Sequence, residues 1–324
     1  MFSKTNLWTL TLILSLSSLF LPAKSNWGKW GEDDQIGTLN YITPEVIMHA
    51  VGLVKQGKVF NLALPLEKGV PSGGSRYGRI RRYMVAIGNG DGNYEDPGLA
   101  TDHLFTPLHG PTHWDGLAHI FGDGRLYNGF DATTNITPRG ALKDGVHNAA
   151  DKIATRGVLI DVARYKQVRW LASGYAITPE DLEGAAREQG VAFRSGDVVL
   201  IRTGYMARWH VEGRAEFYDG SPGIGWEVSQ WLQRIQAAAV AVDNMEVEVV
   251  PAEPGAAERI GQRWGMPIHY ELLRNQGMMI GDWFWLDELA DDCASDGVYE
   301  FLFVAPPLKI VNGSGSPVNP LAIK

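Results

Sequence analysis

The chain has 324 residues, of which 20% are charged, and its formal net charge at pH 7 is −8. This length suits one large domain or two small ones and is ample for a sizeable core. No stripe of lysine and arginine stands out except RIRRY (79–83), so nucleic acid is not an expected partner, and the single cysteine excludes an intramolecular disulfide.

The first 25 residues have the pattern of a secretory signal peptide. Lys4 supplies a positive start, residues 7–21 form an apolar run, and Ala23 and Ser25 offer the small residues of a cleavage site before Asn26. The run is shorter than the roughly 20 apolar residues of a membrane span; an uncleaved N-terminal anchor is the alternative. We therefore predict an exported protein, periplasmic or secreted, without stable membrane insertion after cleavage, in which residues 26–324 form a single domain.

Four segments have the pattern of helices. Thr43 and Pro44 open the first as N-cap and first helical residue, and its apolar periodicity ends at Gly57. A second helix of the same kind is expected over 178–190. The other two are expected in GWEVSQWLQRIQ (225–236) and WLDELADDC (285–293), and the latter contains Cys293 as a structural residue.

Strand-like runs bounded by Gly or Asp lie between these helices, at 58–64, 81–87, 156–162, 196–204, 237–243 and 299–308. The continuous apolar runs at 198–201 and 237–242 predict strands that are buried on both faces. Helices must then cover the sheet. The predicted fold class is α/β, with a mixed sheet and surrounding helices.

The segment LHGPTHWDGLAH (108–119) holds regularly spaced protic side chains. His109, His113, Asp115 and His119 lie four, two and four residues apart, so in extended backbone all four side chains point to the same side. A straight strand would separate the outer two by about 33 Å, and one metal ion cannot bind ligands so far apart. A shared site therefore requires bends, which the glycines and the proline at 110, 111 and 116 permit.

His113 and Asp115 are a natural chelating pair for a divalent metal ion. Imidazole and carboxylate together suit Zn²⁺, Mn²⁺ or Fe²⁺. A hydrogen-bonded surface loop is the alternative for such a segment. Outside it, His269 in MPIHYELL is the best remote candidate for a site residue, and His103 is close enough in sequence to line a pocket.

Residues 109–119 resemble the hallmark of the cyclase family of metal-dependent hydrolases, which includes kynurenine formamidases and isatin hydrolases. The family pattern is H-x-G-T-H-x-D-x-x-x-H; here it reads HGPTHWDGLAH, with Pro111 at the position of the family glycine. The segments WGEDDQIGTLNYITPE, RGVLIDVARY, GDVVLIRTGY and APPLKIVNGSGSPVNPLAI are similar to the longer members of the family. The resemblance therefore covers the whole chain after the predicted signal peptide.

The resemblance implies a role for each matching residue. It places His109, His113 and Asp115 among the metal ligands and makes His119 the catalytic histidine. It implies His269 and Asp282 as further ligands, although the family has the longer glutamate at the second position. It also implies the family's swivelling β/β/α fold, Zn²⁺ or Mn²⁺ as cofactor, and assembly into a homodimer or homotetramer.

The leading hypothesis is a metal-dependent amidohydrolase or lactonase that hydrolyses a C–N or C–O bond at a carbonyl. The metal ion would lower the pKa of a water and polarise the carbonyl. His119 would take up the proton and return it to the leaving group. Trp114 and Trp283 could supply apolar walls for a ring-bearing small-molecule substrate, such as a cyclic amide or imide, a lactone or an N-formyl amide.

Two other functions fit part of the pattern. His113, Asp115 and His269 satisfy the two-histidine, one-carboxylate pattern of non-haem Fe(II) oxygenases, which leaves the other two histidines of the segment without a role. The second alternative is an exported metal- or ligand-binding protein without catalysis, for which the aspartate at position 282 is the only support. GSGSPVNP (313–320) lacks the last glycine of a G-x-S-x-G elbow, so serine catalysis is not expected.

Overall fold

The computed structural model describes residues 25–70, 79–88, 98–213, 217–261 and 265–324. The predicted signal peptide lies outside the described residues, apart from Ser25, and its cleavage stays a prediction. No helix within the described ranges is long and apolar enough to cross a membrane.

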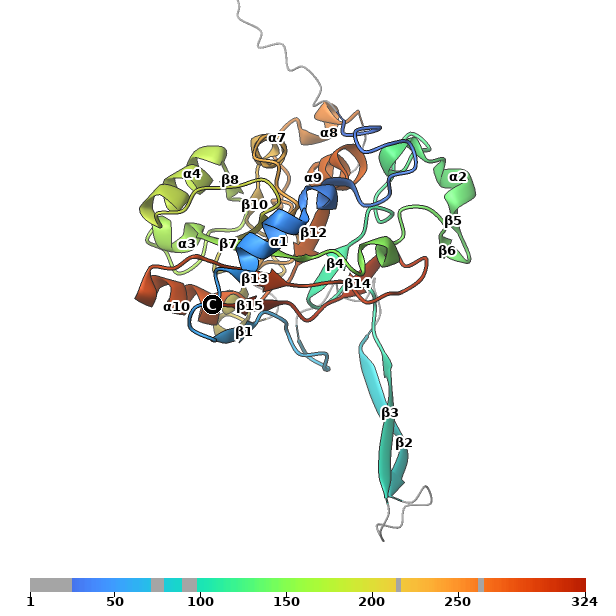
Figure 1. Ribbon diagram of the computed structural model, residues 1–324, viewed down its shortest axis with the longest axis horizontal. Helices are drawn as coiled ribbons and strands as arrows, with labels where there is room; N and C mark the ends of the chain where they lie inside the picture. The colour runs from blue at the N-terminus through green and yellow to red at the C-terminus, as the bar shows by residue number, and fades with distance from the viewer. Residues whose placement is uncertain (1–24, 71–78, 89–97, 214–216, 262–264) are drawn as a thin grey trace, which may run out of the picture.

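A nine-stranded mixed sheet organises the described part of the chain (Figure 1). In spatial order its strands are β1 (Val59–Asn61), β15 (Leu321–Ile323), β13 (Glu300–Val304), β7 (Ala154–Asp161), β9 (Val198–Arg202), β11 (Ala239–Val242), β12 (Met279–Asp282), β4 (His113–Asp115) and β14 (Gly315–Pro317). The strands from β7 to β12 are parallel to one another, and those on either side pair antiparallel. This architecture confirms the predicted α/β class with a mixed sheet.

The centre of the sheet is apolar because its strands are covered on both faces. Every residue of β11 is buried, and so are the first four residues of β9. Val158, Val199 and Val240 occupy neighbouring register positions across three strands and are fully buried. The predicted double burial of the runs at 198–201 and 237–242 is thus confirmed, and these strands form the middle of the main core.

The four predicted helices are present among the described helices, although the first ends at Val51 and not at Gly57 as predicted. Thr43 caps α1 by accepting a hydrogen bond from the Val46 N–H, and Thr178 forms a capping box with Asp181 at the start of α4. Cys293 is buried within α10, as expected of a structural residue. The α-helices are α1 (Pro44–Val51), α2 (Ala132–Asn135), α3 (Val162–Tyr165), α4 (Pro179–Glu188), α5 (Met206–Val211), α7 (Trp226–Arg234), α8 (Ala256–Arg259), α9 (Pro267–His269) and α10 (Asp287–Asp296).

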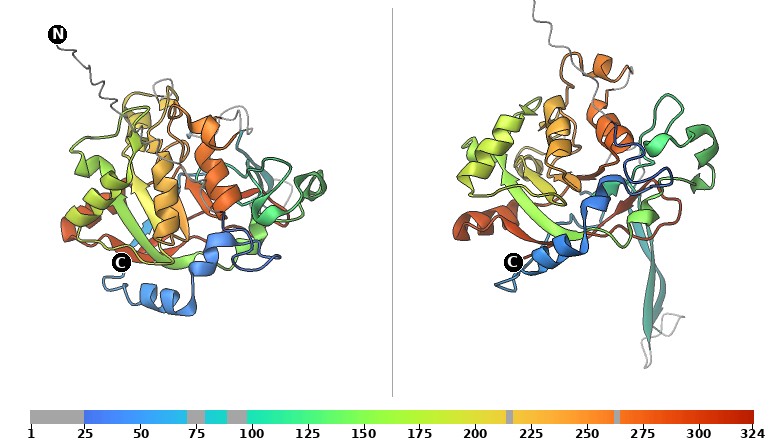
Figure 2. Two further views of the ribbon diagram at one scale, coloured as in Figure 1. Left: turned by 90° about the horizontal axis from the view of Figure 1, so that it is seen from above. Right: turned by 45° about the horizontal axis from the view of Figure 1, so that its top comes forward.

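Helices α4 and α7 and the segment α9–η5 lie side by side (Figure 2). The segment η5 (Tyr270–Gln276) is a π-helix that continues directly from α9. It packs against β12, whereas α4 packs against β7. The 3₁₀ segments are η1 (Gly37–Tyr41), η3 (Tyr127–Gly129) and η4 (Val146–Ala149).

Three two-stranded sheets lie outside the main sheet. They pair β5 (Ile136–Thr137) with β6 (Gly140–Ala141), β8 (Ala176–Ile177) with β10 (Gly223–Ile224), and β2 (Arg81–Gly88) with β3 (Leu99–Phe105). The strand predicted at 81–87 is therefore a strand, but it belongs to a hairpin that extends away from the body of the molecule (Figure 1).

Asp144 is a buried carboxyl group beside the N-terminal segment. The residue is 1% exposed, and neither carboxyl oxygen has a hydrogen-bond partner among the described residues. Burial, together with the nearby charge of Asp34, raises the pKa of Asp144 to about 8, although Lys143 acts in the opposite direction. The folded protein therefore holds this carboxyl group protonated at neutral pH.

We expect the substitution Asp144→Asn to stabilise the protein at pH 7 and to leave its stability at pH 4 unchanged. An aspartate in the unfolded chain ionises at about pH 3.9, so folding takes up a proton between that pH and about pH 8. Native stability therefore falls as the pH rises through this window. Asparagine does not titrate, so the variant does not lose stability in this way. Its free energy of unfolding at pH 7 is therefore higher than that of the wild-type protein by up to about 4 kcal/mol.

Thermal unfolding of the variant and the wild-type protein at both pH values measures this effect. Asp151→Asn is the control, because the Asp151 side chain is exposed and its removal leaves the melting temperature unchanged. A lower melting temperature for Asp144→Asn at pH 7 would show instead that the Asp144 carboxylate is ionised and holds a bound cation or ordered water.

Candidate metal centre

Strand β4 forms the middle of the predicted metal-binding segment. Its His113 and Asp115 side chains point to one face of the strand and Trp114 to the other, as the alternation of a strand requires. Because β4 pairs with β12, His113 lies directly opposite Asp282. Such cross-strand neighbours have Cβ atoms about 5 Å apart, which brings two predicted ligands together from distant parts of the sequence.

The chain bends on both sides of β4, as the spacing of the segment required. Gly110 has a φ of 138°, a conformation that side chains rarely adopt. Gly116 donates its N–H to the Ser314 carbonyl, and a Cβ at Gly116 would lie 2.8 Å from that oxygen. With these bends His109 and His119 meet, and their ring centroids are 4.0 Å apart.

The carboxylate of Asp115 is the centre of the cluster, and four imidazole rings surround it. Its Oδ1 lies 2.6 Å from His109 Nδ1 and 3.2 Å from His113 Nε2. Its Oδ2 lies 3.5 Å from His269 Nε2 and 3.8 Å from His119 Nε2. Burial alone would raise the pKa of Asp115, but the charge of His119 and hydrogen bonds from the other three rings outweigh it and hold the pKa well below its usual value.

His269 reaches the cluster from the junction between α9 and η5. Its Nε2 is also 4.0 Å from Asp282 Oδ2. Its Nδ1 lies 3.1 Å from Glu248 Oε1, which accepts a further hydrogen bond from the His269 backbone N–H. Burial alone would lower the pKa of His269, but the hydrogen bonds to Asp115 and Glu248 raise it well above the usual value. Glu248 thus fixes the orientation of the ring, as carboxylates commonly do beside metal-binding histidines.

The charges of the cluster fit a divalent cation. Asp282 is 3% exposed, and its Oδ1 has no hydrogen-bond partner among the described residues. Burial, with the charges of Asp115 and Glu246, raises the pKa of Asp282 well above the usual value, against the opposite effect of His269. A cation between these carboxylates would offset their repulsion and provide a partner for the orphaned oxygen.

Two sets of predicted ligands are close enough to share a metal ion. In each set one donor atom per residue lies within 4.8 Å of the others; the sets are His109, His113 and Asp115, and Asp115, His269 and Asp282. Asp115 belongs to both sets. The shorter side chain of Asp282 therefore still reaches the cluster, and metal binding by these five residues stays a prediction.

His119, the predicted catalytic histidine, belongs to neither set. Its side chain is 17% exposed, more than that of any other imidazole of the cluster. Burial lowers the pKa of His119 to about 4, although the charge of Asp115 acts in the opposite direction. The ring is therefore neutral at physiological pH and able to accept a proton.

The structure does not bring two of the predicted pocket residues to the cluster. Trp114 is fully buried on the face of β4 opposite the ligands, where it packs against Phe284 and donates a hydrogen bond to the Ala305 carbonyl. Strand alternation makes it a core residue. His103 lies on the exposed strand β3, opposite Tyr83 in the hairpin.

Trp283, the third predicted pocket residue, forms a left-handed turn directly after Asp282. Its φ of 64° costs a residue other than glycine roughly 1–2 kcal/mol. The Trp283 N–H donates to the Asn244 carbonyl, and its own carbonyl accepts a hydrogen bond from Thr112 Oγ1. The residue is 3% exposed, and its ring packs beside that of Phe217. These contacts hold the ends of β12 and β4 together, and a role for Trp283 as a substrate wall stays a prediction.

Three residues of the cluster escaped the sequence analysis: Glu246, Glu248 and Ser314. The two glutamates directly follow β11, at the carboxyl ends of the parallel strands. This position is typical of ligand sites. An E-x-E pattern after a buried strand is the signal that could have identified them. Ser314 Oγ lies 3.0 Å from His109 Nε2. No sequence pattern marks this contact, because it depends on the pairing of β14 with β4.

We expect Gly315→Ala to weaken metal binding by displacing His109. Gly315 lies opposite Asp115 in the β14–β4 pair, and a Cβ at this position would be 2.5 Å from His109 Cε1. The ring cannot move without loss, because Asp115 and Ser314 hold its two nitrogens. Metal affinity measured by calorimetric titration should fall about 10- to 100-fold.

Gly265→Ala is the matched control for this substitution, because a Cβ there would meet nothing within 4 Å. It should leave metal affinity unchanged. Equal affinities for all three proteins would show that His109 is not a ligand.

An aromatic cavity of about 620 Å³ lies beside the turn that follows β12. Leu64 and Trp285, both in its wall, connect it to the ligand strands: the Leu64 N–H donates to Thr112 Oγ1, and the Trp285 N–H donates to the Leu62 carbonyl. The other lining residues include Pro65, Val70, Trp209, His210 and Glu288.

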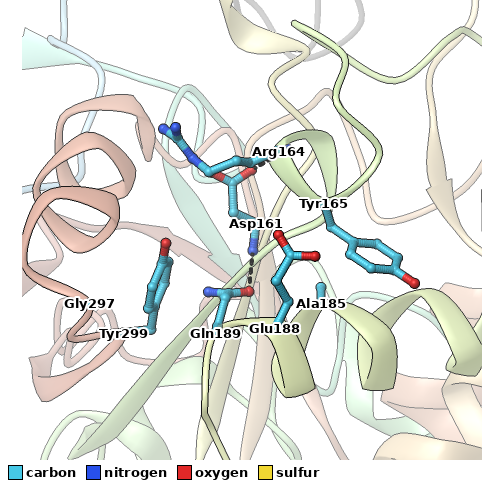
Figure 3. A pocket seen from close by; sticks show the side chains of 8 residues that line it. All are labelled: Asp161, Arg164, Tyr165, Ala185, Glu188, Gln189, Gly297 and Tyr299. Atoms are coloured by element: carbon cyan, nitrogen blue, oxygen red, sulfur yellow. Dashed lines mark hydrogen bonds and ion pairs between the residues drawn. The ribbon is translucent and has the colours of Figure 1, made fainter.

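None of the predicted site residues lines the aromatic cavity, and none lines a smaller cavity of about 220 Å³ (Figure 3). Asp161 in its wall is held by ion pairs with Arg164 and Arg202. Its lining is polar and includes Glu188, Gln189 and Tyr299.

Comparisons with known proteins agree on one family and one fold. The family model named Cyclase matches residues 34–249. A crystal structure of a novel cyclase is 38% identical, has a TM-score of 0.84, and covers 93% of this chain and 98% of that chain. No curated protein sequence matches the chain.

Isatin hydrolases share the fold at lower sequence identity. Isatin hydrolase A from Labrenzia aggregata, bound to benzyl benzoate, is 21% identical with a TM-score of 0.59, over 84% of this chain and 94% of that chain. An isatin hydrolase bound to the product analogue thioisatinate is 17% identical with a TM-score of 0.56, over 86% of this chain and 98% of that chain.

Proposed function

The chain belongs to the Cyclase family, and from this premise we propose that it is a metal-dependent hydrolase that opens a C–N or C–O bond at a carbonyl. The observation that carries the proposal is the arrangement around Asp115. Two sets of predicted ligands share this carboxylate, and His119 stands beside them without belonging to either. A neutral imidazole next to a metal centre is what a hydrolase needs and a storage or binding protein does not.

The arrangement favours hydrolysis over the oxygenase alternative. The three residues of an Fe(II) triad, His113, Asp115 and His269, divide between the two sets of ligands. The triad would also leave His109 without a role, although its ring contacts Asp115 directly.

The proposed mechanism assigns proton transfer to His119. A divalent metal ion, Zn²⁺ or Mn²⁺, supplies Lewis acidity that lowers the pKa of a water and polarises a carbonyl. His119 accepts the proton of the attacking water and returns it to the leaving nitrogen or oxygen. The Asp115 carboxylate, 3.8 Å from His119 Nε2, stabilises the imidazolium formed in between. Glu248 and Ser314 keep the rings of His269 and His109 in place.

We propose a ring-bearing substrate: a cyclic amide or imide, a lactone or an aromatic N-formyl amide. The aromatic cavity beside the β12 turn supports this class, because Trp209 and Trp285 offer flat apolar walls. The isatin hydrolases that share the fold make isatin a suitable member of the first test panel.

A substrate panel tests the proposed function. The purified protein is loaded with Zn²⁺ or Mn²⁺ and incubated with isatin, N-formyl anilines and unsaturated lactones, and the ring-opened or deformylated products are measured by mass spectrometry. Metal-dependent hydrolysis of at least one class is expected. No hydrolysis of any compound by the metal-loaded protein would support the binding-protein alternative, and oxygen consumption that requires Fe²⁺ would support the oxygenase.

We also propose that the protein is exported with cleavage before Asn26. The described fold supports this boundary: Asn26 is 5% exposed, and its backbone N–H donates to the Asn275 carbonyl. N-terminal sequencing of protein from a periplasmic extract or the culture medium should begin at Asn26. Recovery of the full chain in the membrane fraction would favour the uncleaved anchor.

A further inference from the structure

The wall of the aromatic cavity carries acidic side chains as well as aromatic ones. Glu67, in the loop after Leu64, and Glu288, in the first turn of α10, both line the cavity and are exposed. Neither glutamate forms an ion pair with another residue of the described ranges. Among the described lining residues, Lys68 carries the only ammonium group against these two carboxylates. The charge of the wall therefore favours a cation over an anion.

Two tryptophans form the aromatic part of the wall, and neighbouring rings hold them in place. Trp209, on α5, packs edge-on against Phe217, and Trp285 packs edge-on against His210, each at a ring centroid distance of 5.5 Å. Both tryptophans are partly buried against a second, smaller hydrophobic core that contains Trp283. The face of a tryptophan ring attracts cations more strongly than that of any other aromatic side chain. Because these rings are already ordered, a ligand loses little binding free energy in fixing them.

We propose that the aromatic cavity binds the cationic end of the substrate, which is a ring compound with a quaternary or tertiary ammonium group and no carboxylate. The inference rests on the proposed function and names its substrate class more closely. The tryptophans contact the ammonium group and the two glutamates balance its charge, which is how proteins commonly recognise quaternary ammonium ligands. A neutral ring uses the tryptophans alone, and a carboxylate is repelled by the glutamates.

The cavity is close enough to the metal centre for one substrate to occupy both. Trp285 follows Asp282 by three residues, so their Cα atoms lie at most about 11 Å apart. On the other strand, Leu64 donates its N–H to Thr112 Oγ1, and Thr112 directly precedes His113. A substrate with its carbonyl at the metal centre can therefore reach the cavity with its other end. The ammonium group then stays apart from the predicted ligands, none of which lines the cavity.

Two benzyl alcohols that differ in charge test the inference. 4-(Trimethylammonio)benzyl alcohol and 4-tert-butylbenzyl alcohol have nearly the same shape, and neither contains a bond that a hydrolase of this kind could cleave. Calorimetric titration of the metal-loaded protein therefore measures binding alone. We expect the cationic alcohol to bind about tenfold more tightly than the neutral one.

Two substitutions separate the contributions of charge and ring. Glu288→Gln removes one exposed charge, so it should weaken binding of the cationic alcohol about threefold and leave the neutral alcohol unaffected. Trp285→Leu keeps an apolar wall without an aromatic face, and it should abolish the preference for the cation. Glu227→Gln is the matched control, because Glu227 is an exposed glutamate in the first turn of α7, outside the described lining of the cavity. It should change neither affinity.

Equal affinity of the wild-type protein for the two alcohols would overturn the inference, and so would a preference for the cation that both variants retain. Neither result affects the proposed function, which the substrate panel tests by hydrolysis. A wild-type protein that prefers the cation but hydrolyses no compound of the panel would support the cation site and reject the hydrolase. In the class of compound that is hydrolysed, a trimethylammonio substituent should give a lower KM than a tert-butyl substituent, and equal KM values would show that the cavity does not hold the substrate.

Discussion

His119→Ala should abolish hydrolysis while leaving the metal content of the protein unchanged. His119 lies outside both sets of predicted ligands, so its removal takes away a proton acceptor and no metal–ligand bond. Loss of a general acid–base group lowers kcat by about 10²- to 10⁴-fold. Turnover of the best compound of the substrate panel, measured together with elemental analysis of the same sample, checks both halves of the expectation.

His49→Ala is the matched control for His119→Ala. His49 lies on α1, and its Nε2 accepts a hydrogen bond from Arg194, outside the cluster. Its loss should change neither turnover nor metal content. If His119→Ala turns over substrate at the wild-type rate, the role of His119 as base is wrong; if it loses the metal, His119 is itself a ligand.

Asp115→Asn should remove metal binding altogether, because Asp115 is the residue shared by both sets of ligands. The amide keeps the size of the side chain but removes the negative charge that holds four imidazole rings. Losing one partner of a buried charge pair typically costs about 3–5 kcal/mol of stability. We therefore expect no bound metal, no hydrolysis and a lower melting temperature than that of the chelator-treated wild-type protein.

Asp243→Asn separates loss of metal from the general cost of altering a buried aspartate. Asp243 is 1% exposed and directly follows β11, and its carboxylate accepts hydrogen bonds from Thr203 and Gly204. This variant should lose stability and still bind metal. Metal bound by Asp115→Asn with wild-type affinity would contradict the proposed centre.

The two predictions address different parts of the proposed function. His119→Ala tests the chemistry with the metal present, and Asp115→Asn tests the binding of the metal itself. If Asp115→Asn loses the metal while His119→Ala keeps its turnover and its metal, the protein binds metal as proposed but does not use His119 as the base.

Local features of the sequence predicted the local structure. The N-caps Thr43 and Thr178 and the buried run at 198–201 could be read directly, because capping and periodicity depend on residues a few positions apart. The same holds within the metal-binding segment: parity placed His113 and Asp115 on one face of a strand. Applied to the residue between them, parity would also have placed Trp114 on the opposite face of the strand, away from the ligands.

Longer-range features required the tertiary structure. The resemblance to the cyclase family pointed to His269 and Asp282, but their positions follow from the pairing of β12 with β4 and from the π-helix after His269. Glu248 and Ser314 come from a loop and a terminal strand that only the assembled sheet brings to the cluster.

The sequence by itself therefore determined the fold class, the helix starts, the buried strands and the common orientation of the histidine segment, because each follows from neighbours along the chain. Only the tertiary structure decided which distant residues surround Asp115, that His103 stands on an exposed hairpin, and that His119 is left outside the ligand sets. The physical reason is that these positions depend on strand register and on burial between segments far apart in sequence, which local periodicity does not encode.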